Sequence, residues 1–228
     1  SQKGLITMIK IDPPISDLSA QETLVERVRA NAAAHPEAPA LVCGTQRVTW
    51  GAFDGRINRV ANALLEMGVG KGDNIAVLSS NSIPYAELFM GIVRAGACAT
   101  PLSSMASPDA LRKMLEDSGA KAVFVAEQYL HLLSDFISDL PLERIAIDFT
   151  HSDFVDYEAT LARADTSDPM IPIEMSDAFN LIYSSGTTGT PKGILHNHQM
   201  RAAQMDRVSP NGYDDNARTL ISTPLYSN

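Results

Sequence analysis

Apolar residues recur along much of this chain at the spacing of an α-helix. Over residues 51–67 they lie three or four positions apart, so that they fall on one helical face. These apolar positions are Phe53, Ile57, Val60, Ala61 and Leu64. Gly68 predicts the end of this helix, because glycine accepts the left-handed conformation common there. The pattern predicts further helices over residues 19–34, 82–94, 107–118 and 128–138.

Short stretches rich in β-forming residues lie between these helices. They predict strands over residues 74–78, 97–100, 121–126, 144–147 and 179–183. Strands separated by long helices indicate a parallel sheet with helices on its faces. We therefore predict the α/β class, with a parallel-rich sheet covered by helices.

Three segments have additional local signals. Residues 40–43 and 47–50 flank Gly44-Thr45 and predict a separate hairpin. Ser107, Pro108 and Asp109 form a favourable helix start, with a hydroxyl cap, a proline in the first turn and an acid near the positive helix end. Residues 149–176 contain two prolines and read as a connection with one short helix.

Charge and cysteine content exclude several classes of function. The chain has 18 basic and 27 acidic residues, a net charge of −9, and no basic cluster. Nucleic-acid binding is therefore not expected as its main role, because phosphate neutralisation needs clustered Lys and Arg. Cys43 and Cys98 are too few and too far apart for a disulfide framework or a metal site, and we expect two buried thiols. No apolar run reaches the length of a membrane span, and the N-terminus has no signal-peptide pattern, which favours the cytoplasm.

The most unusual stretch, SSGTTGTPKG, spans residues 184–193. Its glycines allow sharp turns and close approach of a ligand to the backbone, and successive N–H groups in such turns form anion nests. Lys192 adds a mobile positive charge. Five hydroxyls accompany it, from Ser184, Ser185, Thr187, Thr188 and Thr190. Together these groups are suited to cradling phosphates.

Two other interpretations of this stretch fit less well. In the common nucleotide loop, G-x-x-x-x-G-K-[ST], the lysine follows glycine and precedes a hydroxyl that binds Mg²⁺. Here Lys192 lies between Pro191 and Gly193, so that loop is excluded. A flexible polar linker is the other alternative. It does not explain the apolar strand before the loop or the Gly-Ile-Leu after it.

The run YSSGTTGTPKG, from Tyr183 to Gly193, closely resembles the phosphate-loop signature of the adenylate-forming superfamily. This superfamily includes acyl-CoA synthetases, adenylation domains of peptide synthetases and firefly-type luciferases. Residues 47–82, 92–103, 107–124 and 222–228 are also similar to its segments, in the same order. The resemblance covers residues 24–228 and is strongest to acyl-CoA synthetases. It implies the fold of the N-terminal part of the large domain of an adenylate-forming enzyme.

The resemblance implies a two-step ligase. A carboxylate attacks the α-phosphorus of ATP to give an acyl-adenylate and pyrophosphate, and a thiol, usually that of coenzyme A, then takes the acyl group. The implied cofactors are ATP, Mg²⁺ and coenzyme A, and Thr188 is the implied metal contact. The nucleotide-binding residues are predicted to be Ser184, Ser185, Gly186, Thr187, Thr188, Gly189, Thr190 and Lys192.

Two residues after the loop are assigned to the substrate pocket by the same resemblance. His198 matches a histidine that the family has six positions after the lysine. The alternative to a role in the pocket is that His198 begins a helix and orients the loop. Tyr226 matches an aromatic position near the acyl and nucleotide pockets. Ser227 stands where the family commonly has histidine, which puts the usual gating of the pocket in doubt.

The same comparison of motifs predicts an incomplete domain. Residues 1–228 are expected to be the first part of an N-terminal AMP-binding domain that ends inside a core motif, without the C-terminal lid domain and inactive alone. An adenylation domain of a peptide synthetase is the first alternative, and a luciferase-type oxygenase fits less well. A non-catalytic phosphate-binding module is an alternative from another class. The sequence does not specify the carboxylic acid or the oligomeric state.

Overall fold

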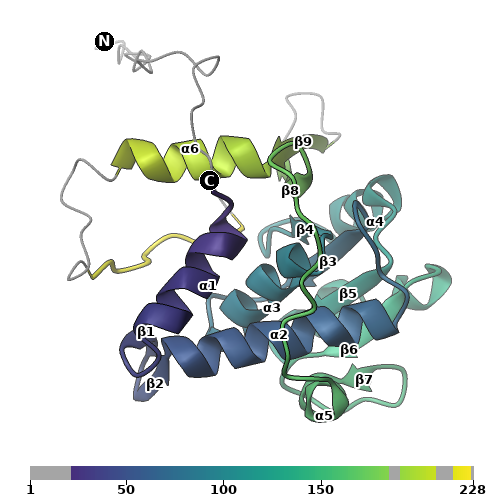
Figure 1. Ribbon diagram of the computed structural model, residues 1–228. Coiled ribbons are helices and arrows are strands. Elements are labelled where there is room, and N and C mark those ends of the chain that lie inside the picture. The colour runs from purple at the N-terminus through teal and green to yellow at the C-terminus, as the bar shows by residue number, and fades with distance from the viewer. Residues whose placement is uncertain (1–21, 185–190, 209–217, 227–228) are drawn as a thin grey trace, which may run out of the picture.

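The computed structural model describes residues 22–184, 191–208 and 218–226 (Figure 1). The first elements are helix α1 (Leu24–Ala34) and a hairpin of β1 (Pro39–Cys43) and β2 (Gln46–Thr49). The main sheet then alternates with helices. Its strands are β3 (Asn74–Leu78), β4 (Cys98–Pro101), β5 (Ala122–Val125), β6 (Glu143–Ala146), β7 (Val155–Asp156), β8 (Ala178–Ser184) and β9 (Lys192–Asn197). The remaining α-helices are α2 (Trp50–Glu66), α3 (Ile83–Arg94), α4 (Pro108–Ser118), α5 (Tyr157–Arg163) and α6 (His198–Val208).

The main sheet has seven strands in the order β7-β6-β5-β3-β4-β8-β9. Every neighbouring pair is parallel except β8 and β9, which are antiparallel. The predicted α/β class with a parallel-rich sheet is confirmed. The β1–β2 hairpin forms its own two-stranded sheet, as predicted.

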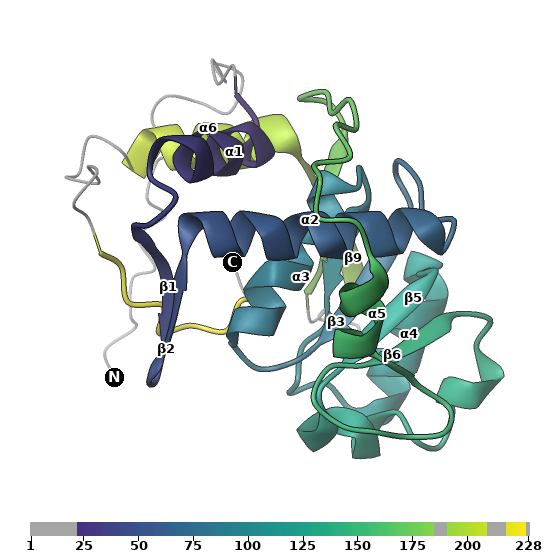
Figure 2. The same cartoon turned by 60° about the horizontal axis from the view of Figure 1, so that its bottom comes forward.

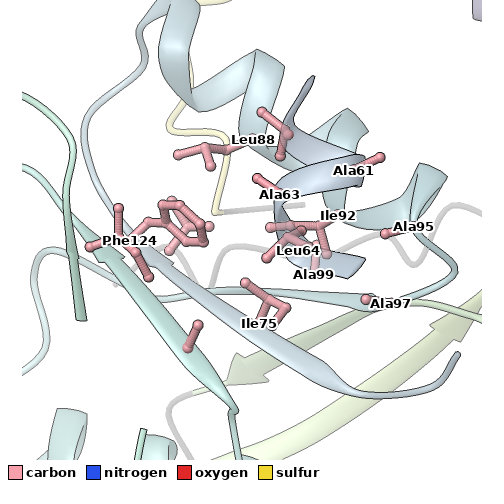
Figure 3. Close-up of a cluster of buried hydrophobic side chains, with 14 of the residues drawn as sticks. Ala61, Ala63, Leu64, Ile75, Leu88, Ile92, Ala95, Ala97, Ala99 and Phe124 are labelled. Carbon is pink, nitrogen blue, oxygen red and sulfur yellow. The ribbon is translucent and has the colours of Figure 1, made fainter. Parts of the chain in front are cut away.

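Alternate residues of the central strand β3 face two different layers. Ile75 and Val77 belong to a core cluster with α2, α3 and α5, whereas Ala76 and Leu78 belong to one with α4. This alternation follows from the two-residue repeat of a strand, and both faces are apolar because helices cover both. Figure 3 shows Ile75 and Phe124 of the sheet beneath Leu64, Leu88 and Ile92 of the helices.

Helices α2 and α3 pack unusually closely at Gly91. A Cβ atom added there would lie 2.4 Å from both Cβ and Cγ1 of Val60 on α2. Arg94, one turn later on α3, is fully buried, and its Nη1 lies 2.7 Å from Asp54 Oδ1 and donates to Asn58 Oδ1 at 2.6 Å. The contact between these helices therefore needs a small residue on one turn and a paired charge on the next.

The predicted ends of the 107–118 helix agree with the structure. The Ser107 hydroxyl accepts a hydrogen bond from Ala110 N–H, and Pro108 is the first residue of α4. At the other end Gly119 adopts a left-handed φ of 57°. Helix α1 begins later than the predicted residue 19: it starts at Leu24, because Thr23 and Glu26 cap it reciprocally.

The predicted helix over residues 128–138 is wrong. The structure has two 3₁₀ segments, Glu127–Leu132 and Ile137–Asp139. Leu133 and Phe136, which lie between them, are buried with Ile137 in the core cluster of α4 and the sheet. The Ser134 hydroxyl donates to the His131 carbonyl between them. Short polar side chains compete in this way with the backbone bonds of a continuous helix. The connection over residues 149–176 contains the predicted short helix, α5, together with the two-residue strand β7.

The expectation of two buried thiols needs correction. Cys98 is buried, but Cys43 is exposed, because it lies at the turn of the β1–β2 hairpin. Among the described residues, no helix is long and apolar enough to cross a membrane.

Candidate active site at the carboxyl edge of the sheet

The loop singled out in the sequence joins β8 to β9. Ser184 ends β8 and is paired in register with Lys192, the first residue of β9. Because β8 runs parallel to β4, this end of the hairpin lies at the edge of the sheet where the parallel strands finish. Ligands of open α/β sheets bind outside that edge. The Lys192 side chain is exposed and forms no ion pair with any residue that the structure describes.

The base of the hairpin is held by Tyr183. Its hydroxyl donates to Asp117 Oδ2, just before the end of α4, at 2.7 Å. Burial, and then the neighbouring Asp117, raise the pKa of Tyr183, so that the phenol stays protonated and donates. Gly193 faces Tyr183 across the hairpin, and a Cβ there would lie 2.9 Å from Leu181 Cδ1. The hydrogen bond between Tyr183 and Asp117 ties β8, the strand that enters the loop, to α4.

A pocket of about 250 Å³ opens at the same edge of the sheet. Strands β3 and β5 are neighbours in the sheet. From β3 the chain continues to β4 on one side of this pair, and from β5 it continues to β6 on the other side. Adjacent strands whose connections diverge in this way leave a crevice between their carboxyl ends. The pocket lies over that crevice and has uncharged, mainly hydroxyl-bearing walls. They are formed by Ser80, Asn81, Ser104, Tyr129, Ser222, Thr223, Pro224 and Tyr226.

Tyr226 is one wall of this pocket. Its hydroxyl lies 3.5 Å from Ser104 Oγ, which follows β4. On another wall, the Ser80 and Tyr129 hydroxyls are 2.6 Å apart. Leu225, the residue before Tyr226, packs against the main core cluster and so ties this segment of the chain to the body of the domain.

His198 lies in a different environment from Tyr226. It begins α6 and is fully buried, and its backbone N–H donates to the Asp177 carbonyl at 3.1 Å. The ring meets Phe179 edge-on, with centroids 5.1 Å apart. Its two ring nitrogens have no hydrogen-bond partner among the described residues. Burial lowers the pKa of His198 to about 4, with Asp177 opposing that shift, so the ring is neutral at pH 7.

His198 is not among the residues that line the pocket, and its predicted place in a substrate pocket stays a prediction. Helix α6 starts at His198, which agrees with the alternative interpretation that this residue begins a helix. Helix α6 also lies beside α1 (Figure 2), where Arg27 Nη2 pairs with Asp206 Oδ1 at 2.7 Å.

The structure brings Ser184 and Lys192 together. The other predicted nucleotide contacts, with the proposed metal contact Thr188, lie outside the described residues; they are Ser185, Gly186, Thr187, Thr188, Gly189 and Thr190. Ser227 also lies outside them. Within the described ranges, no group of three or more His, Cys, Asp or Glu residues could hold a metal ion.

Of the residues that line the pocket, only Tyr226 was singled out from the sequence. Four of the others come from elements far from it in the chain: Ser80, Asn81, Ser104 and Tyr129. Their signal is position. Ser80 and Asn81 come directly after β3, and Ser104 comes soon after β4. Polar residues that follow buried parallel strands gather at one edge of the sheet, so this rule would have selected the first three.

The family model of the AMP-binding enzymes matches residues 28–227. The chain belongs to this family. A 3-hydroxybenzoate–CoA ligase from Aromatoleum sp. (strain CIB) is 33% identical over 169 residues, which cover 70% of this chain and 31% of that protein. Surfactin synthase subunit 3 from Bacillus subtilis (strain 168) is 30% identical over 194 residues, which cover 85% of this chain and 14% of that protein.

Solved structures of the AMP-binding enzymes have the same fold. The anthranilate CoA ligase AuaEII in complex with anthranoyl-AMP matches with a TM-score of 0.75 and 27% identity, over 81% of this chain and 36% of that one. The N-terminal domain of FACL13 from Mycobacterium tuberculosis matches with a TM-score of 0.67 and 26% identity, over 78% of this chain and 45% of that one. The chain spans about a third of the length of the CoA ligases that it resembles.

Proposed function

We propose that the full-length protein is an ATP-dependent carboxylate–CoA ligase. In the first step a carboxylate oxygen bonds to the α-phosphorus of ATP, and the bond to the departing pyrophosphate breaks. In the second step a thiol sulfur bonds to the acyl carbon, AMP leaves with the electron pair of its bond to that carbon, and the thiol proton is released. The products are a thioester, AMP and pyrophosphate.

The observation that carries this proposal is the hairpin of an AMP-binding enzyme with Ser184 and Lys192 at the two ends of its loop. Lys192 is exposed and forms no ion pair within the described ranges, so its ammonium group is available to a phosphate. Ser184 adds a hydroxyl donor beside it. Both are held by a hairpin anchored at Tyr183. Positioning and charge stabilisation of this kind are the main protein contributions to displacement at phosphorus.

Mg²⁺ and coenzyme A belong to this proposal on different grounds. Mg²⁺ commonly binds through one or two protein oxygens together with substrate phosphates, and does not need a cage of carboxylates. Thr188 is our proposed protein contact. When bound, the ion neutralises the charge that develops on the leaving pyrophosphate. Coenzyme A is proposed from the similarity to CoA ligases.

An adenylation domain that loads a carrier protein is the second candidate. The similarity to a surfactin synthase subunit supports it. The two differ in the thiol that accepts the acyl group, so they are separated by offering coenzyme A and a carrier protein side by side. A stand-alone phosphate-binding module is the third. Titration of ATP into the 228-residue chain tests it, and we expect weak binding because Ser184 and Lys192 offer contacts to phosphates alone.

Incubation of the full-length protein with ATP, Mg²⁺, coenzyme A and a panel of carboxylic acids tests the proposal directly. The panel should include aromatic acids, long-chain fatty acids and amino acids. We expect one class to give an acyl-CoA, AMP and pyrophosphate in equal amounts by mass spectrometry. Formation of ADP and phosphate instead, or of no thioester with any acid, would contradict the proposed ligase.

A further inference from the structure

The side chain of Asn81 is hydrogen-bonded to the backbone of one wall of the pocket. Asn81 follows β3, and its amide makes two hydrogen bonds to the backbone of residues 223–225. Its Nδ2 donates to the Thr223 carbonyl at 2.9 Å, and its Oδ1 accepts from the Leu225 N–H at 2.8 Å. An asparagine amide that donates and accepts in this way mimics a neighbouring β-strand and fixes both the position and the direction of the segment.

Tyr226 comes directly after the residues that Asn81 holds. On one side it faces Ser104 across 3.5 Å. On another it lies near Tyr85 of α3, which is fully buried and whose hydroxyl has no hydrogen-bond partner among the described residues. Burial, and then proximity to Tyr226, raise the pKa of Tyr85. A buried hydroxyl that lacks a partner among these residues costs free energy, and Tyr226 lies close enough to this one to influence it electrostatically.

We propose that Asn81 is a positioning residue, which sets the substrate pocket by holding residues 223–225 so that Tyr226 forms its wall. The proposal rests on the proposed function and on the predicted place of Tyr226 in the substrate pocket. Asn81 lines the pocket, and one of its two amide N–H donors and one lone pair of its amide oxygen bind the backbone of the segment. In this proposal its effect on the substrate passes through Tyr226.

Three variants separate this role from a general loss of stability. Asn81→Ala removes both hydrogen bonds. Asn81→Asp keeps an acceptor for Leu225 N–H but sets a carboxylate against the Thr223 carbonyl. Asn62→Ala is the matched control, because Asn62 also donates to two backbone carbonyls, those of Asp165 and Ser167, away from the pocket.

Hydrogen exchange tests the contact itself without any substrate. We expect the Leu225 amide to exchange about tenfold faster in Asn81→Ala, as for the loss of one hydrogen bond, and to stay protected in Asn81→Asp and Asn62→Ala. Unchanged exchange at Leu225 in a folded Asn81→Ala protein would overturn the proposal.

Steady-state kinetics of the full-length protein test the consequence. Asn81→Ala is expected to raise KM for the carboxylic acid about tenfold with kcat changed less than about threefold, since it loosens a wall and removes no reacting group. Asn62→Ala should leave both constants within about twofold of wild type. Faster exchange at Leu225 with an unchanged KM would overturn the positioning role. If the wild-type protein activates no carboxylate at all, the proposed function fails while the exchange experiment still decides whether Asn81 holds the segment.

Discussion

Lys192 is the residue on which the proposed phosphate site depends most directly. Lys192→Ala removes the only charged side chain of the loop, and we expect it to slow adenylation by about 10²-fold, as for the loss of one preorganised donor to developing charge. Thr188→Ala is predicted to slow the same step. The measurement is the rate of acyl-adenylate formation in a single turnover.

Lys113→Ala is the matched control for Lys192→Ala. Lys113 is also exposed, and it lies on α4 rather than on the hairpin. Its substitution should leave adenylation within about twofold of wild type. Wild-type rates in both Lys192→Ala and Thr188→Ala would show that the loop does not bind the phosphates.

At the scale of residues, the sequence offers a prediction where a side chain stands in a motif and none where its role depends on a distant partner. The loop motif predicts phosphate contacts for Lys192 and Ser184, which the structure places opposite each other on β8 and β9. Asn81 acquires its role from the backbone of Thr223 and Leu225, about 140 positions later, which no local pattern indicates. The exposure of Cys43 depends on its place at a hairpin turn and not on its residue type.

At the scale of elements, the packing of α2 on α3 makes a prediction that opposes helix propensity. Alanine favours a helix over glycine by about 1 kcal/mol. Gly91→Ala should nevertheless lower the free energy of unfolding by about 1–3 kcal/mol, because its Cβ would lie 2.4 Å from Val60. Urea denaturation measures the change.

Gly55→Ala on α2 is the control for Gly91→Ala. No heavy atom outside its own helix turn lies within 4 Å of a Cβ at this position. This substitution should therefore raise the free energy of unfolding by about 0.5–1 kcal/mol. Equal effects of the two substitutions would contradict the close packing at Gly91.

The attachment of α6 is expected to weaken in acid through His198. An unfolded histidine titrates near 6.5, and burial lowers the pKa of His198 to about 4 in the folded protein. The unfolded chain therefore binds the proton more readily, and the stabilisation present above pH 6.5 is lost as the pH falls toward 4. Between pH 7 and pH 4 the free energy of unfolding should fall by about 3 kcal/mol more in the wild type than in His198→Phe.

His131→Gln is the control for this pH dependence, because His131 is exposed. It should unfold with the same pH dependence as wild type. The Phe variant keeps an aromatic ring against Phe179. An identical pH dependence in wild type and His198→Phe would show that His198 is not buried in its neutral form.

Element prediction followed the strength of local signals. The cap of α4 and the apolar face of α2 are local signals, and those two helices formed where expected. The 128–138 segment has helical apolar spacing, but tertiary packing and Ser134 divide it into 3₁₀ turns. Strand β9 was not predicted. It is an edge strand that exposes Ile194 and Leu195 and follows a loop, so its alternation is weak.

At the scale of the whole molecule, the sequence predicted the class of the sheet but not its order. Alternating strands and helices indicate parallel pairing, because each crossover helix returns the chain to the same edge. The divergence of the chain on either side of β3 and β5 was not visible in that pattern. That divergence creates the crevice under the pocket, so the location of the pocket followed only from the fold.

The central claim is that the full-length protein activates a carboxylate with ATP through the β8–β9 loop. The most direct test is the exchange of labelled pyrophosphate into ATP in the presence of each acid of a broad panel. We predict exchange that depends on at least one acid and that falls about 10²-fold in Lys192→Ala. The absence of exchange with every acid, in a folded wild-type protein supplied with Mg²⁺, would contradict the claim.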